Sequence, residues 1–342
     1  MDTITTSDLL AHVERGVATA TLNRPSALNA LSWDMIVGLR KLLDAWEQDG
    51  NVRVVVLRGA GEKAFCAGGD IRAFYRQFQG HGRVDHEFFE VEYALDYRIH
   101  TYAKPIVAWI DGVVMGGGMG LSQGAALRVV GERTRMAMPE TAIGLFPDVG
   151  GSYFLSRTPG ALGFYIGLVG PTLDAADALY AGLADIYLTP ASLERLDEWI
   201  ATAPMETIAS RDDRARLDRS ELETLRDGIE RHFNAPSVEA IVESLPHEPV
   251  HREWAQRTRE ALLRNSPLSL KLTHEQLRRG RHMTLADCFR MELGLVRAAL
   301  DHSDFFEGIR ALLIDKDRKP RWDPARLEDV TAQHVDQFFH QP

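Results

Sequence analysis

Two glycine-rich stretches stand out in this chain: Phe65-Cys66-Ala67-Gly68-Gly69-Asp70-Ile71 and Met115-Gly116-Gly117-Gly118-Met119-Gly120. Each lies where a short strand should end and a helix should begin. Glycine permits tight turns and close backbone approach, so either stretch alone is most simply a strand-to-helix turn. As a pair they offer backbone N–H groups from two loops, which suits a carbonyl oxygen that gains negative charge. The pair therefore predicts chemistry at an acyl group.

Strands and helices alternate around these stretches. Residues 17–22, 52–58 and 105–110 are short runs of small, apolar and β-branched residues, which predict strands. Ser32 is a plausible N-cap for a helix that continues to about Gln48, because apolar residues recur behind it at helical spacing. Alternation of this kind predicts an α/β layered fold.

The rest of the chain becomes progressively more helical. Residues 126–130 and 136–138 predict further short strands, and residues 167–184 predict a helix that is interrupted at Pro171 and resumes from Asp174. From about residue 192 the composition shifts to charged residues with apolar residues at helical spacing, which is typical of helices with a solvated face. The charged segment 315–320 could be a surface loop or part of a site.

Composition and charge exclude several classes of protein. The 342 residues contain 39 Lys plus Arg and 49 Asp plus Glu, a net charge of −10 that argues against nucleic-acid binding. No apolar run of about 18 residues appears, so we expect no membrane partner. Residues 1–4 show no signal peptide, and Cys66 and Cys288 are too few for a disulfide framework, so we expect a cytoplasmic protein. No metal site is expected, because no histidine, including His12, His251 and His302, pairs with cysteine at zinc-ligand spacing.

Residues 138–151 form a third notable stretch, Met-Pro-Glu-Thr-Ala-Ile-Gly-Leu-Phe-Pro-Asp-Val-Gly-Gly. Glu140 and Asp148 are the acids of this otherwise apolar, Gly/Pro-rich segment. Burial would raise the pKa values of both carboxyls and suit them to acid–base chemistry. The alternative is that Glu140 is simply exposed and that Asp148 caps a helix starting near Val149.

Together these stretches resemble the crotonase, or enoyl-CoA hydratase/isomerase, superfamily. Asn23-Arg24-Pro25 and Leu28-Asn29-Ala30 precede the first glycine stretch, and Lys104-Pro105 precedes the second, in that family's order and spacing. The resemblance implies a crotonase-like fold of repeated ββα units with a helical C-terminal region, assembled as trimers or hexamers. We accordingly expect residues 1–190 to form the core with the CoA and acyl site, and residues 191–342 to be mainly helical.

Within the superfamily the chain most closely resembles the 3-hydroxyisobutyryl-CoA hydrolase family. The likeness lies in residues 138–151, 266–271 and 308–317. It implies hydrolysis of 3-hydroxyisobutyryl-CoA, or a close 3-hydroxyacyl-CoA, in valine catabolism. Enoyl-CoA hydratases use two glutamates, and Gly120 stands where one of them belongs, so hydration is disfavoured. An enoyl-CoA hydratase or isomerase, and a non-catalytic acyl-CoA binding protein, are the alternatives.

The resemblance also assigns roles to residues. The N–H groups of Gly69 and Gly117 would hold the thioester oxygen, and Glu140 would attack the carbonyl carbon or activate water. The substrate-binding residues would be Gly117, Glu140, Asp148 and Glu92, with Glu92 preferred to Glu90. Coenzyme A is part of the substrate, so no separate cofactor is expected. Its adenine end would rest near Ala27, Leu28, Ala67, Gly68, Gly69, Asp70 and Ile71.

Overall fold

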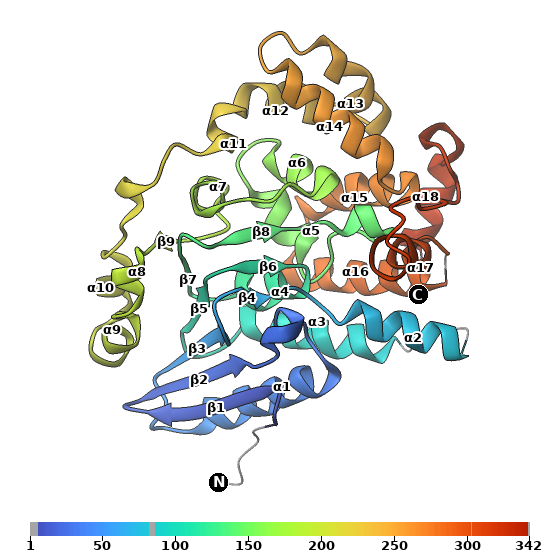
Figure 1. The fold of residues 1–342 in the computed structure, drawn as a ribbon. Coiled ribbons are helices and arrows are strands. Elements are labelled where there is room, and N and C mark those ends of the chain that lie inside the picture. The colour runs from blue at the N-terminus through green and yellow to red at the C-terminus, as the bar shows by residue number, and fades with distance from the viewer. Residues whose placement is uncertain (1–5, 82–85, 302, 341–342) are drawn as a thin grey trace. The chain divides into compact units, whose positions relative to one another are not determined.

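The computed structural model describes residues 6–81, 86–301 and 303–340 (Figure 1). Residues 1–4, where the sequence predicts no signal peptide, and His302 lie outside the described residues. The chain divides into two compact units. The first comprises Met1–Gly69, Val91–Ala137 and Thr172–Glu223, and the second comprises Asp70–Glu90, Met138–Pro171 and Thr224–Pro342. The expected division at residue 190 stays a prediction.

The first unit is built on two sheets. A six-stranded sheet has the order β1-β2-β3-β5-β7-β9, in which only the β1–β2 pair is antiparallel. A smaller parallel sheet has the order β4-β6-β8. The strands are β1 (Leu9–Glu14), β2 (Val17–Leu22), β3 (Val54–Gly59), β4 (Ala64–Cys66), β5 (Ile106–Ile110), β6 (Val113–Met115), β7 (Leu127–Val130), β8 (Arg135–Ala137) and β9 (Ile186–Tyr187).

The predicted strands correspond to β2, β3, β5, β7 and β8, which confirms the α/β alternation. Helix α1 (Trp33–Gln48) begins after Ser32, whose side chain accepts a hydrogen bond from the Met35 N–H, so the predicted cap is correct. Helices α8 (Pro190–Leu193), α9 (Leu196–Thr202) and α10 (Met205–Ala209) contribute to one apolar cluster with the large sheet. That cluster joins Val56, Val107 and Val129 to Leu196 and Trp199.

In the second unit the described residues form helices and no strands. The α-helices that lie wholly within it are α2 (Ile71–His81), α5 (Gly151–Phe154), α6 (Leu162–Val169), α12 (Arg226–Phe233), α13 (Val238–Ser244), α14 (Arg252–Arg264), α15 (Pro267–Gly280), α16 (Leu285–Leu300), α17 (Ser303–Ile309) and α18 (Ala332–Phe339). Helix α3 (Glu87–His100) has residues in both units. Helix α6 starts at Leu162 rather than at Gly167, and it stops at Val169 because Gly170 takes the left-handed conformation before Pro171.

The helix predicted to resume at Asp174 is α7 (Ala175–Tyr180), in the first unit. The Asp174 side chain accepts a hydrogen bond from the Asp177 N–H and so caps that helix. Among the residues that the structure describes, no helix is both long enough and apolar enough to cross a membrane.

The Asn29 side chain connects the turn before α1 to the segment that leads into the first glycine stretch. Its side chain is fully buried, and its backbone has a φ of 56°, in the left-handed region that asparagine tolerates. The Asn29 Oδ1 accepts from the Arg24 N–H at 2.9 Å. The Asn29 Nδ2 donates to the carbonyl oxygens of Ala60 at 3.0 Å and Ala64 at 2.8 Å. One side chain therefore satisfies three backbone groups and places the start of β4.

We predict that Asn29→Ala lowers the free energy of unfolding by about 3 kcal/mol, because it leaves buried backbone groups without partners, each costing roughly 1–3 kcal/mol. Urea denaturation followed by circular dichroism measures the change. Asn51→Ala is the matched control, since the exposed Asn51 side chain reaches only Asp49. Equal denaturation midpoints for the two variants would contradict the role of Asn29.

Candidate active site

The two glycine stretches meet within the first unit. The Ala67 N–H donates to the Leu28 carbonyl at 3.0 Å, and the Leu31 N–H donates to the Gly68 carbonyl at 2.8 Å. Gly68 has a φ of 95°, and a Cβ built on it would lie 3.1 Å from the Met115 carbonyl oxygen and 3.4 Å from the Gly117 nitrogen. The first loop therefore packs directly against the start of the second, as their proposed common function requires.

Helix α4 (Gly117–Gln123) begins at the second glycine stretch. The Gly117 N–H belongs to the first turn, whose donors have no acceptor within their own helix. A Cβ on Gly118 would lie 2.3 Å from the Cys66 carbonyl oxygen, so only glycine allows α4 to approach β4 this closely. The glycines permit a tight strand-to-helix turn, and that turn also presents backbone donors. The two interpretations of the glycine stretches are therefore compatible.

Glu92 lies against this helix start. Its side chain is 3% exposed, and a Cβ on Gly117 would come within 2.4 Å of its Oε1 atom. Asp96, one turn further along α3, is fully buried. By contrast, Glu90 forms an ion pair with Arg297 at 2.7 Å, within the second unit and at its surface. The structure therefore brings Glu92 to Gly117, and it engages Glu90 elsewhere.

Cys66 lies beside these acids and behaves as an apolar residue. The pKa of the Cys66 thiol is raised to about 12, mainly by burial and in smaller part by the charges of Glu92 and Asp96. Asp96 was not predicted as a site residue. The sequence nevertheless contains a signal for Asp96. Glu92 and Asp96 are four residues apart, on the face of α3 that also carries Phe89 and Tyr93.

Glu140 begins the short 3-10 helix η2 (Glu140–Ile143) in the second unit. The side chain is 5% exposed, so the interpretation of Glu140 as an exposed acid is wrong. Burial, and then the charge of Asp148, raise the pKa of the Glu140 carboxyl well above its ordinary value. Its Oε2 atom is buried and has no hydrogen-bond partner among the residues that the structure describes. This is an acid poised to accept or release a proton.

Asp148 lies in the turn before α5 and is 5% exposed. The capping interpretation of Asp148 is wrong, because α5 begins at Gly151 and its N-cap is Gly150, with no side-chain cap. The Gly151 N–H instead donates to the Asp148 carbonyl at 2.7 Å. The charge of Asp148 raises the pKa of Glu140, so the two predicted acids lie near each other in the second unit.

A third acid, Glu292 on α16, was not predicted. It is fully buried, and its carboxylate accepts from the Gly150 N–H at 2.7 Å and the Ser152 N–H at 2.8 Å. Burial raises the pKa of Glu292 to about 8, with a smaller contribution from the charge of Asp148. The signal that could have found it is a charged residue on the apolar face of a helix, here between Phe289 and Leu295.

Three segments singled out in the sequence, residues 138–151, 266–271 and 308–317, converge on η2. The Ser266 N–H donates to the Thr141 carbonyl at 3.0 Å. A Cβ on Gly308 would lie 2.3 Å from the Ile143 carbonyl oxygen, so α17 also lies directly on η2. Segments far apart in the sequence therefore pack on the short helix that begins with Glu140.

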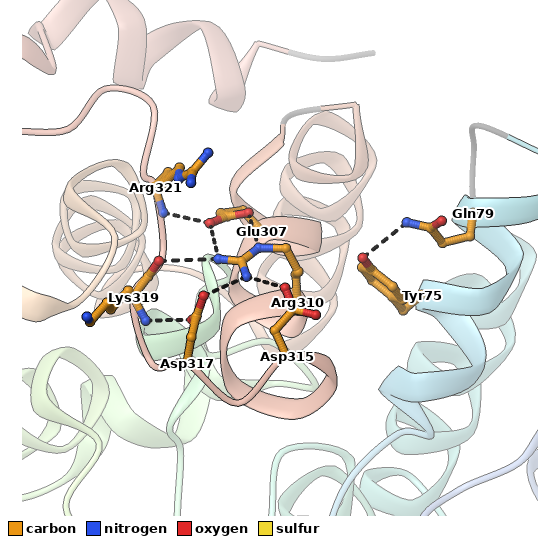
Figure 2. A network of polar contacts seen from close by, with 8 residues as sticks. All are labelled: Tyr75, Gln79, Glu307, Arg310, Asp315, Asp317, Lys319 and Arg321. Carbon is orange, nitrogen blue, oxygen red and sulfur yellow. Dashed lines mark hydrogen bonds and ion pairs between the residues drawn. The ribbon is translucent and has the colours of Figure 1, made fainter.

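The charged segment at residues 315–321 is an exposed loop fastened to the same region (Figure 2). The Arg310 guanidinium donates to Glu307 at 2.8 Å and to Asp317 at 2.9 Å. The Arg321 N–H donates to Glu307 at 2.7 Å, which folds the loop back onto α17. Figure 2 also shows Gln79 bonded to Tyr75 on α2.

The residues expected to hold coenzyme A are distributed over both units. In the first unit, the backbone bond between Ala67 and Leu28 places 67–69 beside 27–28, and Leu28 is 36% exposed. Asp70 and Ile71 belong to the second unit, where the Asp70 side chain accepts from the Ala73 N–H at the start of α2. Over the described residues, no group of three or more His, Cys, Asp or Glu side chains could hold a metal ion.

Comparison with known proteins identifies the class. A family model described as enoyl-CoA hydratase/isomerase matches residues 17–339, and the chain belongs to that family. The crystal structure of a carnitinyl-CoA dehydratase from Mycobacterium thermoresistibile matches with a TM-score of 0.92 and 36% identity, over 98% of this chain and 97% of that one. The crotonase-like fold with its helical C-terminal region is thereby confirmed.

Two curated relatives are more similar to this chain in sequence than that dehydratase is. The Gallus gallus protein named 3-hydroxyisobutyryl-CoA hydrolase, mitochondrial, is 43% identical over 97% of this chain and 89% of its own length. The Arabidopsis thaliana protein named 3-hydroxyisobutyryl-CoA hydrolase 1 is 40% identical over 97% of this chain and 91% of its own. The likeness thus extends over both units.

We predict that neither cysteine of the native protein reacts with iodoacetamide at pH 8, because the reagent needs an exposed thiolate. Cys66 and Cys288 are both fully buried, and burial raises the pKa of each thiol. Mass spectrometry should find no label on the native chain and two labels on the chain unfolded in guanidinium chloride. Modification of native Cys66 at the rate seen in the unfolded chain would contradict its assignment as an inert core residue.

Proposed function

We propose that this enzyme hydrolyses the thioester of 3-hydroxyisobutyryl-CoA, or of a close 3-hydroxyacyl-CoA, to the free acid and coenzyme A, in valine catabolism. The observation that carries the proposal is the buried acid Glu140 in a chain that has a glycine, and so no second glutamate, at position 120. Curated relatives with the hydrolase name, 40–43% identical over nearly the whole chain, support it.

The proposed roles follow the resemblance. The N–H groups of Gly69 and Gly117 hold the thioester oxygen as it gains charge, and removal of one such donor typically costs about 2.7–4 kcal/mol of barrier. Glu140 acts on the thioester carbon, either as the nucleophile or as the general base for water. Asp148, together with Glu92, binds the 3-hydroxyl group of the substrate.

The adenine end of coenzyme A would rest on Ala27, Leu28, Ala67, Gly68, Gly69, Asp70 and Ile71. Leu28 supports this assignment because it is an exposed apolar residue next to the first glycine loop. We further propose that the chain assembles as a trimer or hexamer. The cytoplasmic location stays a prediction, since the Gallus gallus relative is named as mitochondrial.

Hydration of an enoyl-CoA is the second candidate, because the structurally similar Mycobacterium protein is named a carnitinyl-CoA dehydratase. Addition of water across a double bond needs one group to activate the water and another to deliver a proton to carbon. In the resemblance these are two glutamates, and position 120 of this chain is a buried glycine in α4. The absent carboxylate favours hydrolysis, which needs only one acid at the reacting carbon.

We predict thiol release from 3-hydroxyisobutyryl-CoA with a kcat/KM about 10⁴-fold above that for isobutyryl-CoA, because a site built to bind a hydroxyl leaves polar groups unpaired without it. A coloured thiol reagent measures release, and a short 2-enoyl-CoA is included in the panel. Loss of enoyl absorbance without free thiol would instead identify a hydratase. Tight binding of the ester with no turnover would identify an acyl-CoA binding protein.

We predict that kcat/KM rises with pH along a limb centred well above the ordinary glutamate pKa of about 4.3. Glu140 must be ionised to act, and its pKa is raised first by burial and then by Asp148. Asp148→Asn removes a negative charge, lowers the pKa of Glu140 and so moves the limb to lower pH. Glu140→Gln should abolish the limb and reduce kcat by about 10²–10⁴-fold. A limb that moves to higher pH in Asp148→Asn would contradict the assignment.

A single turnover in heavy-oxygen water separates the two chemical routes that remain open for Glu140. Label incorporated into the Glu140 carboxyl indicates an anhydride formed by nucleophilic attack. Label found only in the released acid means that water attacked the acyl carbon, as it does when Glu140 is the general base.

A further inference from the structure

The turn that carries Asp148 has an unusual backbone. Val149 has a φ of 52° and Gly150 a φ of 89°, so two consecutive residues lie in the left-handed region. This region is unfavourable for a β-branched residue such as Val149, and such residues persist only where their surroundings hold them. The direction of the Asp148 side chain therefore depends on whatever fixes residues 147–152.

Two buried side chains hold this turn from opposite ends. Gln276 on α15 donates from its Nε2 to the Pro147 carbonyl at 2.6 Å. Glu292 on α16 accepts from the Gly150 N–H and the Ser152 N–H, one at each carboxyl oxygen, and also from the Ser152 hydroxyl. Thus one carboxyl group receives two backbone donors, one from the second residue of the left-handed pair and one from the first turn of α5.

The same helix closes the space around the turn. Phe289 lies one turn before Glu292, and a Cβ on Gly150 would be 3.1 Å from its Cζ atom. Gly150 can therefore accept neither a side chain nor a large displacement toward α16. Glu292 itself is fully buried and lies on the apolar face of α16. A fully buried carboxyl in such surroundings is unfavourable unless its hydrogen bonds are formed.

We propose that Glu292 is a positioning residue for the reaction: its carboxyl group holds the turn at residues 148–152 and thereby aims Asp148 at the substrate hydroxyl. This inference rests on the proposed function and deepens it by naming the residue that determines selectivity for 3-hydroxyacyl groups. A glutamine cannot replace Glu292, because an amide has one oxygen and must present its own N–H to one of the two backbone donors.

The experiment measures kcat/KM of Glu292→Gln for 3-hydroxyisobutyryl-CoA and isobutyryl-CoA. Misplacing Asp148 should lower the value for the hydroxylated substrate by about 10²-fold and leave the value for isobutyryl-CoA near that of the wild type. A merely structural role would lower both values by the same factor, through a smaller folded fraction, and would overturn the inference. The ratio of the two values is therefore the readout.

Three further variants make the result decisive. Glu253→Gln is the matched control, because the Glu253 side chain is 95% exposed on α14. Glu292→Asp keeps a carboxylate with a shorter reach, and it replaces Glu292→Gln in the measurement if that variant does not fold. In an Asp148→Asn background, Glu292→Gln should leave the substrate ratio unchanged, whereas a further drop would overturn action through Asp148.

The failure of this inference is distinguishable from failure of the proposed function. A wild-type protein that releases no thiol from either ester overturns the proposed function and, with it, the role of Glu292. A wild-type protein that selects the hydroxylated ester, with a Glu292→Gln variant of equal selectivity, overturns the role of Glu292 alone.

Discussion

Close contact between backbones, with no side chain between them, holds the proposed catalytic segments of both units. In the first unit, Gly118 at the start of α4 rests on the carbonyl of Cys66, where any Cβ would be 2.3 Å from the oxygen. In the second, Gly144 and Gly308 place η2 and α17 against each other at the same separation. Such contacts cannot slide without a steric clash, and they therefore orient backbone donors and the first residue of η2 rigidly.

The rigidity matters most for the buried acids. An isolated ionised carboxylate is strongly disfavoured in an apolar environment, and it responds by raising its pKa. Glu140 and Glu292 both show this response, and the charge of Asp148 reinforces it in each. Ionisation of Asp148 therefore disfavours ionisation of Glu140 and of Glu292, because like charges repel. The hydrogen bonds around η2 and α5 must hold this arrangement against the repulsion that ionisation brings.

Much of the fold could be predicted from local pattern. Strands β2, β3 and β5 are continuous runs of small or branched apolar residues, and Ser32 and Asp174 cap their helices through contacts within three residues. Strands β4 and β6 are only three residues long, and their identity depends on pairing with each other, which no local pattern specifies. The start of α6 was likewise missed, because glycines obscured the helical spacing.

The same distinction between local pattern and long-range pairing applies to the candidate site. The glycine loops, Glu140 and Asp148 are recognisable because unusual residues are clustered in short stretches. Glu292 is separated from Gly150 by 142 residues, so its relation to the Asp148 turn exists only after folding. The sequence signal for Glu292 was an acid on an apolar helix face. By itself this pattern does not identify the residues that the acid contacts.

The fold alone does not decide the chemistry of this family. Two loop amides that hold a thioester oxygen serve hydration and hydrolysis equally, since both reactions place negative charge on that oxygen. What separates them is the number of carboxylates at the reacting atoms. Here position 120 is a buried glycine in α4, which supplies no carboxylate. With no carboxylate at position 120, Glu140 is the one acid that we propose for the thioester carbon, and this favours hydrolysis over hydration.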